Sequence, residues 1–162
     1  MRDFHHSVNV LVKAYLNDTL ESRNCYACAC GNLIAEAQGI KFKKQRWHNL
    51  NVKWDIEDED YYPGSNGACN GIGGWGAIIL DNEPNELGAK QIESTGYTIE
   101  ELKRIENAFE KPNRSTLTKA TDETVFKGLM NVVDILADIH GIDLETKEET
   151  KKLFKKPELC LN

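Results

Sequence analysis

The chain has 162 residues, 40% of them hydrophobic, which matches one ordinary domain with enough apolar side chains to bury a core. Its 26 acidic and 20 basic residues give a formal net charge of −6, so general nucleic-acid binding is disfavoured. No stretch approaches about 18 consecutive apolar residues, and the first residues do not resemble a secretory leader. We therefore expect a cytoplasmic protein, neither exported nor membrane-spanning, that folds as a single domain over residues 1–162.

Two helices are expected before residue 40. Apolar side chains recur at helical spacing from Phe4 to Tyr15 and predict an amphipathic helix over residues 3–17. A second, shorter helix is expected to begin at Asn24, a favourable N-cap residue, and to end at Gly39. This second helix would carry the clustered cysteines near its N-terminus.

Residues 40–85 are the part of the chain whose structure is hardest to predict. Three tryptophans, an acidic run over residues 55–60 and several glycines lie close together without a sustained period. Such a long irregular connection is uncommon in a compact domain unless it is functional or contains short elements. Val52–Ile56 and Trp75–Leu80 are candidate short strands, which would allow a β-hairpin within this insert.

Helical patterns return after this insert. A short one over residues 86–94 precedes Thr98 and Glu101, whose spacing predicts a capping box at the start of a helix over 99–110. The longest helix is expected over 122–140, where apolar residues form a broad face. That helix would be the centre of the core.

A last, highly charged helix is expected over residues 144–155, with Leu153 and Phe154 docking on the core. Residues 157–162 are expected to form a loosely held tail. These elements predict a mainly α fold, a single-domain bundle of about five to six helices with an irregular Gly- and Trp-rich insert over 40–85.

The segment containing Cys25, Cys28 and Cys30 is the chemically richest motif. Five cysteines is an odd number, and nothing indicates secretion, so a disulfide framework is a poor interpretation. Thiolates at Cys-x-x-Cys spacing can chelate zinc, with Cys69 as a further ligand. No zinc-finger spacing is present, and the other available ligands are Cys160, His5, His6, His48 and His140.

Two alternatives explain these cysteines without a metal. Small thiols often pack the start of a helix, and this interpretation is favoured because Cys28 and Cys30 would point about 200° apart on a helix over residues 25–37. The other alternative is a cysteine-dependent enzyme, in which the helix N-terminus favours a thiolate and a histidine acts as base.

The histidines are not arranged as metal sites in the sequence. His5 and His6 are adjacent on the first helix, so they would face different directions and are expected to be exposed. His140 ends the longest helix, where a protonated imidazole is mildly favoured by the helix dipole.

Two other motifs in the insert resemble binding-site patterns, one for nucleotides and one for calcium, but neither meets the requirements of its pattern. Gly71–Gly76 matches a dinucleotide-binding pattern, but a turn-rich loop precedes it and a strand-like segment follows it, so nucleotide binding is rejected. The acidic run lacks the glycine of a calcium-binding loop and is expected to be a solvated loop. Trp47, Trp54 and Trp75 are the candidate partner-contact residues.

Several motifs in this order resemble a known family. They are Cys25-x-x-Cys28-Ala-x-Gly31-Asn32, Trp47-His48, Gly96-Tyr97 and Asp122-x-x-x-Phe126-x-Gly128-Leu129. The pattern is similar to a family of small helical proteins from Bacteroidota and their phages, whose activity is not established. Some members are labelled as a subunit of a sodium-translocating quinone reductase, which would require flavin and a two-iron cluster with a longer cysteine spacing, and this sequence supports neither. The resemblance implies a helical accessory protein and provides no substrate or cofactor.

The leading hypothesis is a non-enzymatic binding or adaptor protein, encoded by a phage or mobile element, whose partner is another protein. The glycine- and tryptophan-rich middle would supply its contact surface. The alternative is a small structural zinc protein in which Cys25 and Cys28 hold the metal together with one or two of Cys30, Cys69 and His48. A cysteine-dependent enzyme is the third hypothesis.

Overall fold

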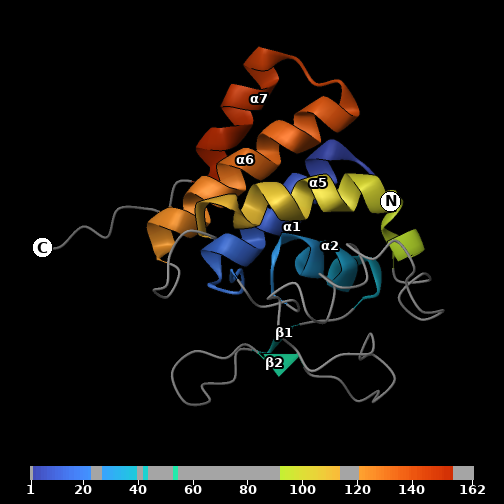
Figure 1. Cartoon of the computed structure of the whole chain (residues 1–162), viewed down its shortest axis with the longest axis vertical. Coiled ribbons are helices and arrows are strands. Elements are labelled where there is room, and N and C mark those ends of the chain that lie inside the picture. The colour runs from blue at the N-terminus through green and yellow to red at the C-terminus, as the bar shows by residue number, and fades with distance from the viewer. Residues whose placement is uncertain are drawn as a thin grey trace, which may run out of the picture.

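A computed structural model of the chain describes residues 2–22, 27–39, 42–43, 53–54, 92–113 and 121–154. The described residues are mainly helical, which confirms the expected fold class (Figure 1). The helices are α1 (Phe4–Leu16), α2 (Ala29–Ala37), α5 (Ile99–Glu110), α6 (Asp122–His140) and α7 (Leu144–Lys151), with short 3-10 helices η2 (Lys111–Asn113) and η3 (Lys152–Phe154).

The capping residues explain why α5 and α6 begin where the sequence predicts. The Thr98 hydroxyl accepts the Glu101 backbone N–H at 3.2 Å, and the Glu101 carboxylate accepts the Thr98 N–H at 2.9 Å. Thr121 and Thr124 form a second reciprocal pair at the start of α6. Gly141 ends α6 in the left-handed conformation, with φ of 65°.

The two described strands form a small antiparallel ladder. β1 (Phe42–Lys43) pairs with β2 (Lys53–Trp54), with Phe42 opposite Trp54. β2 lies within the expected strand at residues 52–56, whereas its partner β1 was not predicted. The other expected strand, over residues 75–80, lies outside the described residues.

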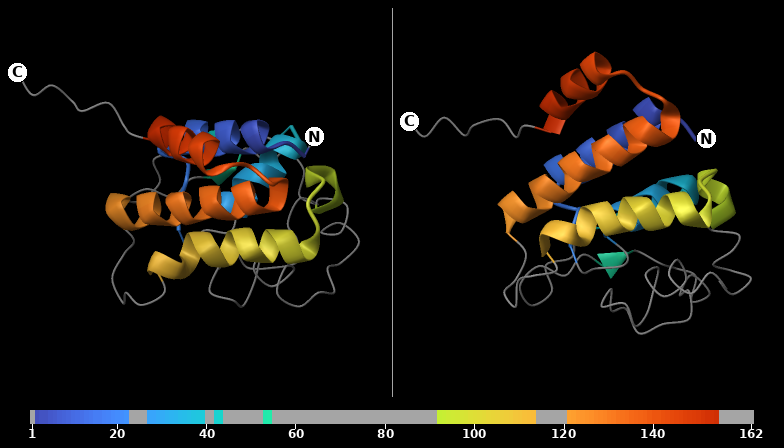
Figure 2. Two further views of the ribbon diagram at one scale, coloured as in Figure 1. Left: turned by 90° about the horizontal axis from the view of Figure 1, so that it is seen from above. Right: turned by 45° about the horizontal axis from the view of Figure 1, so that its top comes forward.

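Four helices enclose the apolar core of the described part. α1 packs against α2 and α6, and α5 packs against the same two helices, so the four form a closed ring (Figure 2). Each helix turns its apolar stripe inward, as Leu11, Ile34, Ile105 and Leu129 do, and all four of these side chains are fully buried. Removal of this apolar surface from water is the main favourable term in folding.

Gly128 allows α6 to lie close to α5. A Cβ atom at this position would stand 2.3 Å from the carbonyl oxygen of Phe109 and 3.0 Å from its Cδ2 atom. A glycine in a helix interior costs about 1 kcal/mol relative to alanine, so its presence here follows from the close approach rather than from helix propensity.

The C-terminal helical segment differs from the expectation in two ways. The α-helix ends at Lys151 and continues as η3, and only Phe154 of the predicted docking pair is buried. Leu153 is 53% exposed. The tighter 3-10 turn rotates successive side chains by about 120°, so it directs Phe154 onto Tyr15 of α1 and Leu153 outward.

Ion pairs add to the contact between α7 and α6. Asp134 of α6 lies 3.2 Å from the ammonium nitrogen of Lys147 and 2.8 Å from that of Lys151. Burial would raise the pKa of Asp134, but the two ammonium groups outweigh it and hold the pKa below its usual value. This contact depends on charge, because α7 itself buries only Thr150.

Candidate functional site

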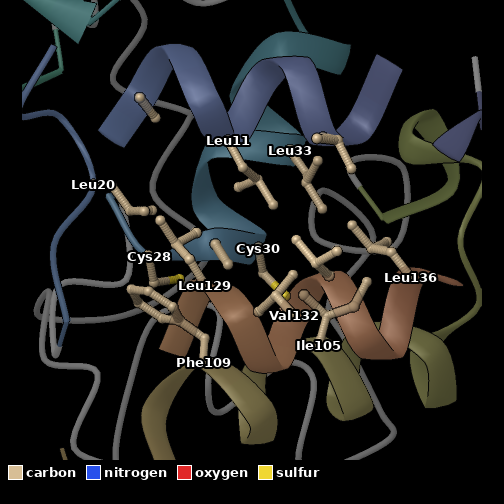
Figure 3. Packing of buried hydrophobic residues seen from close by; sticks show 14 of the residues in the cluster. Leu11, Leu20, Cys28, Cys30, Leu33, Ile105, Phe109, Leu129, Val132 and Leu136 are labelled. Atoms are coloured by element: carbon tan, nitrogen blue, oxygen red, sulfur yellow. The ribbon is translucent and has the colours of Figure 1, made fainter. Parts of the chain in front are cut away.

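Cys28 and Cys30 lie in the apolar core, at the start of α2 (Figure 3). The expected start of this helix at Asn24 is wrong, because Cys28 is the N-cap residue and its sulfur accepts the Gly31 N–H at 3.3 Å. The Cys30 thiol donates to the carbonyl oxygen of Leu102 at 3.3 Å. Since Cys28 precedes the helix, both thiols can face the core instead of pointing apart.

The environment of these cysteines keeps them as thiols. Both side chains are fully buried, and burial together with the Glu106 carboxylate raises the pKa of each thiol well above its ordinary value. A reactive cysteine needs a lowered pKa and access to its substrate. Cys28 and Cys30 therefore act in packing and capping, which disfavours either as a nucleophile.

Two nearly buried carboxylates lie beside the thiols and were not singled out in the sequence. Glu106 and Glu110 are each 8% exposed, and the Ser22 hydroxyl lies 2.6 Å from the Glu110 carboxylate. Both glutamates stand at intervals of four residues from Leu102, which is the signal that could have placed them near the core-facing side of α5.

The predicted metal ligands are not assembled within the described residues. Among residues 2–22, 27–39, 92–113 and 121–154, no three Cys, His, Asp or Glu side chains are grouped so that they could hold a metal ion. His5 and His6 are exposed, as expected, and His140 is engaged elsewhere. Several other candidates lie outside the described residues, namely Cys25, Cys69, Cys160 and His48.

The proposed aromatic contact surface is also largely outside the described part. Trp47 and Trp75 lie outside it, and for Trp54 only the backbone, in β2, is described. The Gly71–Gly76 motif and the acidic run over residues 55–60 lie outside it as well. Their predicted roles stay predictions.

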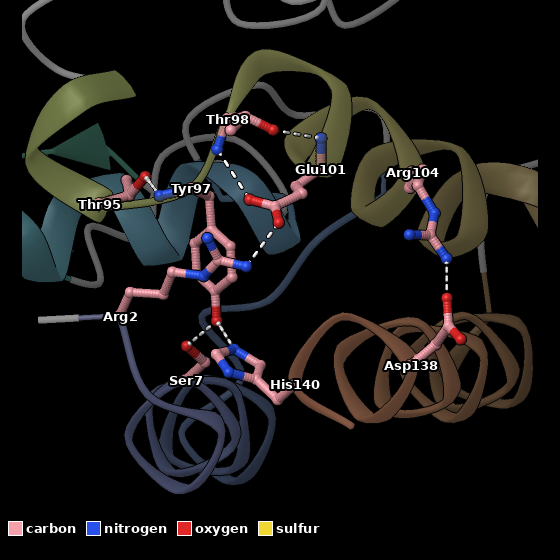
Figure 4. A network of polar contacts seen from close by, with 9 residues as sticks. All are labelled: Arg2, Ser7, Thr95, Tyr97, Thr98, Glu101, Arg104, Asp138 and His140. Carbon is pink, nitrogen blue, oxygen red and sulfur yellow. Dashed lines mark hydrogen bonds and ion pairs between the residues drawn. The ribbon is translucent and has the colours of Figure 1, made fainter. Parts of the chain in front are cut away.

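A buried polar network joins α1, α6 and the residues before α5 (Figure 4). The Tyr97 hydroxyl lies 2.6 Å from the Ser7 hydroxyl and 2.9 Å from Nε2 of His140. Arg2 covers the Tyr97 ring at 5.3 Å and pairs with Glu101. These contacts join the N-terminal segment to Tyr97, to the first turn of α5 and to the C-terminal end of α6.

The electrostatics of this network correct the expectation for His140. Burial and the nearby Arg2 guanidinium lower the pKa of His140, and they outweigh the Asp3 and Glu101 carboxylates, which act to raise it. Burial also raises the pKa of Tyr97. Ser7 is 2% exposed and Tyr97 is 4% exposed, so Ser7 lacks the access to substrate that a catalytic serine needs. The network instead holds α1, α6 and the residues before α5 together.

An open cavity of about 490 Å³ lies between η2 and the N-terminal half of α6. Its volume falls within the range of roughly 300–1,000 Å³ that is usual for small-molecule binding pockets. The described residues that line it are Lys111, Pro112, Phe126, Lys127, Met130 and Asn131. This hollow, here called the η2–α6 cavity, is the candidate functional site.

The walls of the η2–α6 cavity are anchored to the core. Phe126 contacts the Tyr15 ring at a centroid distance of 6.0 Å, and Asn131 donates its amide hydrogen to the carbonyl oxygen of Ala108 at 3.2 Å. Met130 is partly buried against the core. The cavity is therefore backed by the core, and nothing in the sequence periodicity distinguished Phe126 and Met130 from ordinary core positions.

Comparison of the chain with family models, with curated proteins and with solved structures finds no match. The similarity to a family from Bacteroidota and their phages thus stays a prediction from the motifs. Within the described part of the chain, no helix combines the length and apolar character needed to cross a membrane.

Proposed function

We propose that this protein is a non-enzymatic binding protein that engages a protein partner through the η2–α6 cavity. The observation that carries the proposal is the open, apolar-floored hollow formed by Phe126, Met130 and Pro112, backed by the core. Apolar depressions with aromatic and methionine side chains are typical of surfaces that receive a partner side chain.

The chemistry of the other described groups also favours binding over catalysis. The thiols of Cys28 and Cys30 are buried with raised pKa values, and the hydroxyl-bearing residues Ser7 and Tyr97 are also buried. The proposal extends the sequence-based adaptor hypothesis and moves its contact surface from the tryptophan-rich middle to α6.

The proposal is tested by placing a photo-cross-linking amino acid at position 130 of the full chain. The matched control carries the same amino acid at Leu144, an apolar side chain on α7 that is 68% exposed. We expect discrete protein adducts from position 130 in a lysate of the encoding organism and none from position 144. An identical adduct pattern from both positions would contradict the proposal.

A cross-linked partner must then bind in purified form. We expect the purified partner to bind the wild-type protein and to lose binding to Met130→Glu, which places a charge on the apolar floor. Far-ultraviolet circular dichroism of this variant establishes that the helices are retained. Equal binding by the wild type and Met130→Glu would show that the cavity is not the contact.

A further inference from the structure

The rim of the η2–α6 cavity is positively charged, although the chain as a whole carries −6. Lys111 and Lys127 contribute to the lining, and the described lining residues include no acidic side chain. Lys111 is exposed, and the Lys127 side chain is 60% exposed. The cavity thus combines an apolar floor with two exposed lysine side chains among its lining residues.

The ion pair that Lys127 forms within α6 leaves its ammonium group able to bind another carboxylate. Its ammonium nitrogen lies 3.2 Å from the Glu123 carboxylate, and the two side chains are 60% and 77% exposed. Exposed pairs of this kind contribute little to stability, because water competes for both charges. Lys127 can therefore exchange this partner for a carboxylate that is brought into the cavity.

We infer that the η2–α6 cavity takes an acidic amphipathic peptide segment of the partner protein. An apolar side chain of the peptide packs against Phe126 and Met130, and its flanking carboxylates pair with Lys111 and Lys127. The inference rests on the proposed function and names the chemistry of the partner. A peptide is favoured over a nucleic acid because a peptide can carry its carboxylates only where the two lysines lie. A nucleic acid carries a phosphate at every residue and would extend beyond the two lysines onto a chain whose net charge is −6.

The test is a titration of the isotopically labelled full-length protein, followed by NMR amide signals. The probes are three synthetic peptides that share a Leu-Phe centre, flanked by Glu and Asp, by Lys, or by Ser, together with a single-stranded oligothymidylate. We expect the acidic peptide alone to shift the amide signals of Phe126, Lys127 and Met130 saturably, and less so at high salt. Preference for the basic or neutral peptide, or for the oligonucleotide, would overturn the inference.

A matched pair of charge-reversal variants separates local from global electrostatics. Lys127→Glu is compared with Lys152→Glu, because Lys152 is 62% exposed and also pairs with a nearby glutamate, Glu149 of α7. We expect Lys127→Glu to weaken the acidic peptide about fivefold and Lys152→Glu to leave its affinity within about twofold. Equal weakening by both variants would show that only the net charge matters.

The outcomes of this titration and of the cross-linking experiment are distinguishable. Cross-linking at position 130 responds to any protein that enters the cavity, whatever its charge. Specific adducts there, combined with no shift by the acidic peptide, would retain the proposed function and reject the acidic partner. Absence of both results would reject the two together.

Discussion

The Tyr97 hydroxyl oxygen lies 2.9 Å from Nε2 of His140, although the two residues are 43 positions apart in the sequence. The same hydroxyl lies 2.6 Å from the Ser7 hydroxyl, so one phenol connects two helices. A neutral imidazole can accept the phenol hydrogen, whereas a protonated imidazole can only donate. The direction of this hydrogen-bond chain therefore depends on the charge of His140.

The lowered pKa of His140 predicts a pH dependence of stability. The unfolded chain binds a proton at its ordinary pKa of 6.5, whereas burial and Arg2 make the folded state bind it less readily. The contribution of the neutral imidazole is thus complete above the unfolded pKa and is lost as the pH falls through the folded pKa. Urea unfolding of the wild type and His140→Gln across this window measures the difference.

The His140 ring can also be followed directly. Its imidazole signals in the folded protein should titrate below the ordinary value of 6.5. Titration above that value would contradict the assignment of burial as the dominant cause. In that case the Asp3 and Glu101 carboxylates, which raise the pKa of His140, would outweigh burial and Arg2.

Loss of the Tyr97 hydroxyl should destabilise the protein. Tyr97→Phe removes the shared partner of Ser7 and His140, and we expect a loss of about 1–2 kcal/mol in the free energy of unfolding. In a double-mutant cycle, Ser7→Ala should cost less in the Tyr97→Phe background than in the wild type, because its partner is already absent. Chemical denaturation of the four proteins measures this coupling, and strictly additive losses would count against a direct bond.

Gly128→Ala tests the close contact of α5 and α6. Alanine would normally strengthen a helix, but its Cβ atom would stand 2.3 Å from the Phe109 carbonyl oxygen. We expect the helices to separate and the free energy of unfolding to fall by about 1–3 kcal/mol. Gly39→Ala is the control, since no atom lies within 4 Å of the added Cβ and only the positive φ of 68° opposes it. A stabilised Gly128→Ala variant would refute the close approach.

The capping role of Cys28 is tested with two substitutions. Serine retains an acceptor for the Gly31 N–H, whereas alanine does not, so Cys28→Ala should lose about 1 kcal/mol more than Cys28→Ser. A zinc ligand would behave differently, because both variants would lose the metal and the same stability. Thermal unfolding combined with elemental analysis of the wild type and both variants distinguishes cap from ligand.

Burial of Cys28 and Cys30 predicts protection from alkylation. In the folded protein at neutral pH we expect iodoacetamide to modify neither residue, because both thiols are inaccessible and burial raises their pKa. Peptide mapping by mass spectrometry identifies the labelled positions, and addition of denaturant should release both residues together. Rapid selective labelling of either one in the folded state would revive the cysteine-enzyme hypothesis.

Local sequence signals predicted much of the helical framework. Thr98 and Glu101 fixed the start of α5 because their capping contacts involve residues only three apart. Gly141 marked the end of α6 for a similarly local reason. The start of α2 was missed because a cysteine sulfur replaced the usual oxygen as N-cap acceptor. Apolar periodicity and caps are short-range properties, so sequence reasoning reaches them.

The candidate site could not be predicted in the same way. The η2–α6 cavity depends on how η2 meets α6, and in the sequence Phe126 and Met130 differ in no respect from core residues. The Ser7–Tyr97 contact joins residues 90 positions apart. Such features are set by tertiary packing, so no local pattern contains them. The burial of Glu106 could be predicted in part. Its spacing from Leu102 indicates the core-facing side of α5 but does not identify the residues around it.

The interactions that hold α7 differ from those that hold the four-helix ring, so the two parts should open with different free energies. The helical ring is closed by apolar packing, whereas α7 is held by Phe154 and by charge contacts at Asp134. Salt screens such charges but leaves apolar burial intact. Amide hydrogens of α7 should therefore exchange with solvent through a local opening that salt promotes. Amide hydrogens of α5 and α6 should exchange only when the whole domain unfolds. Such an opening would expose Phe154 while the packing of α5 on α6 stays in place.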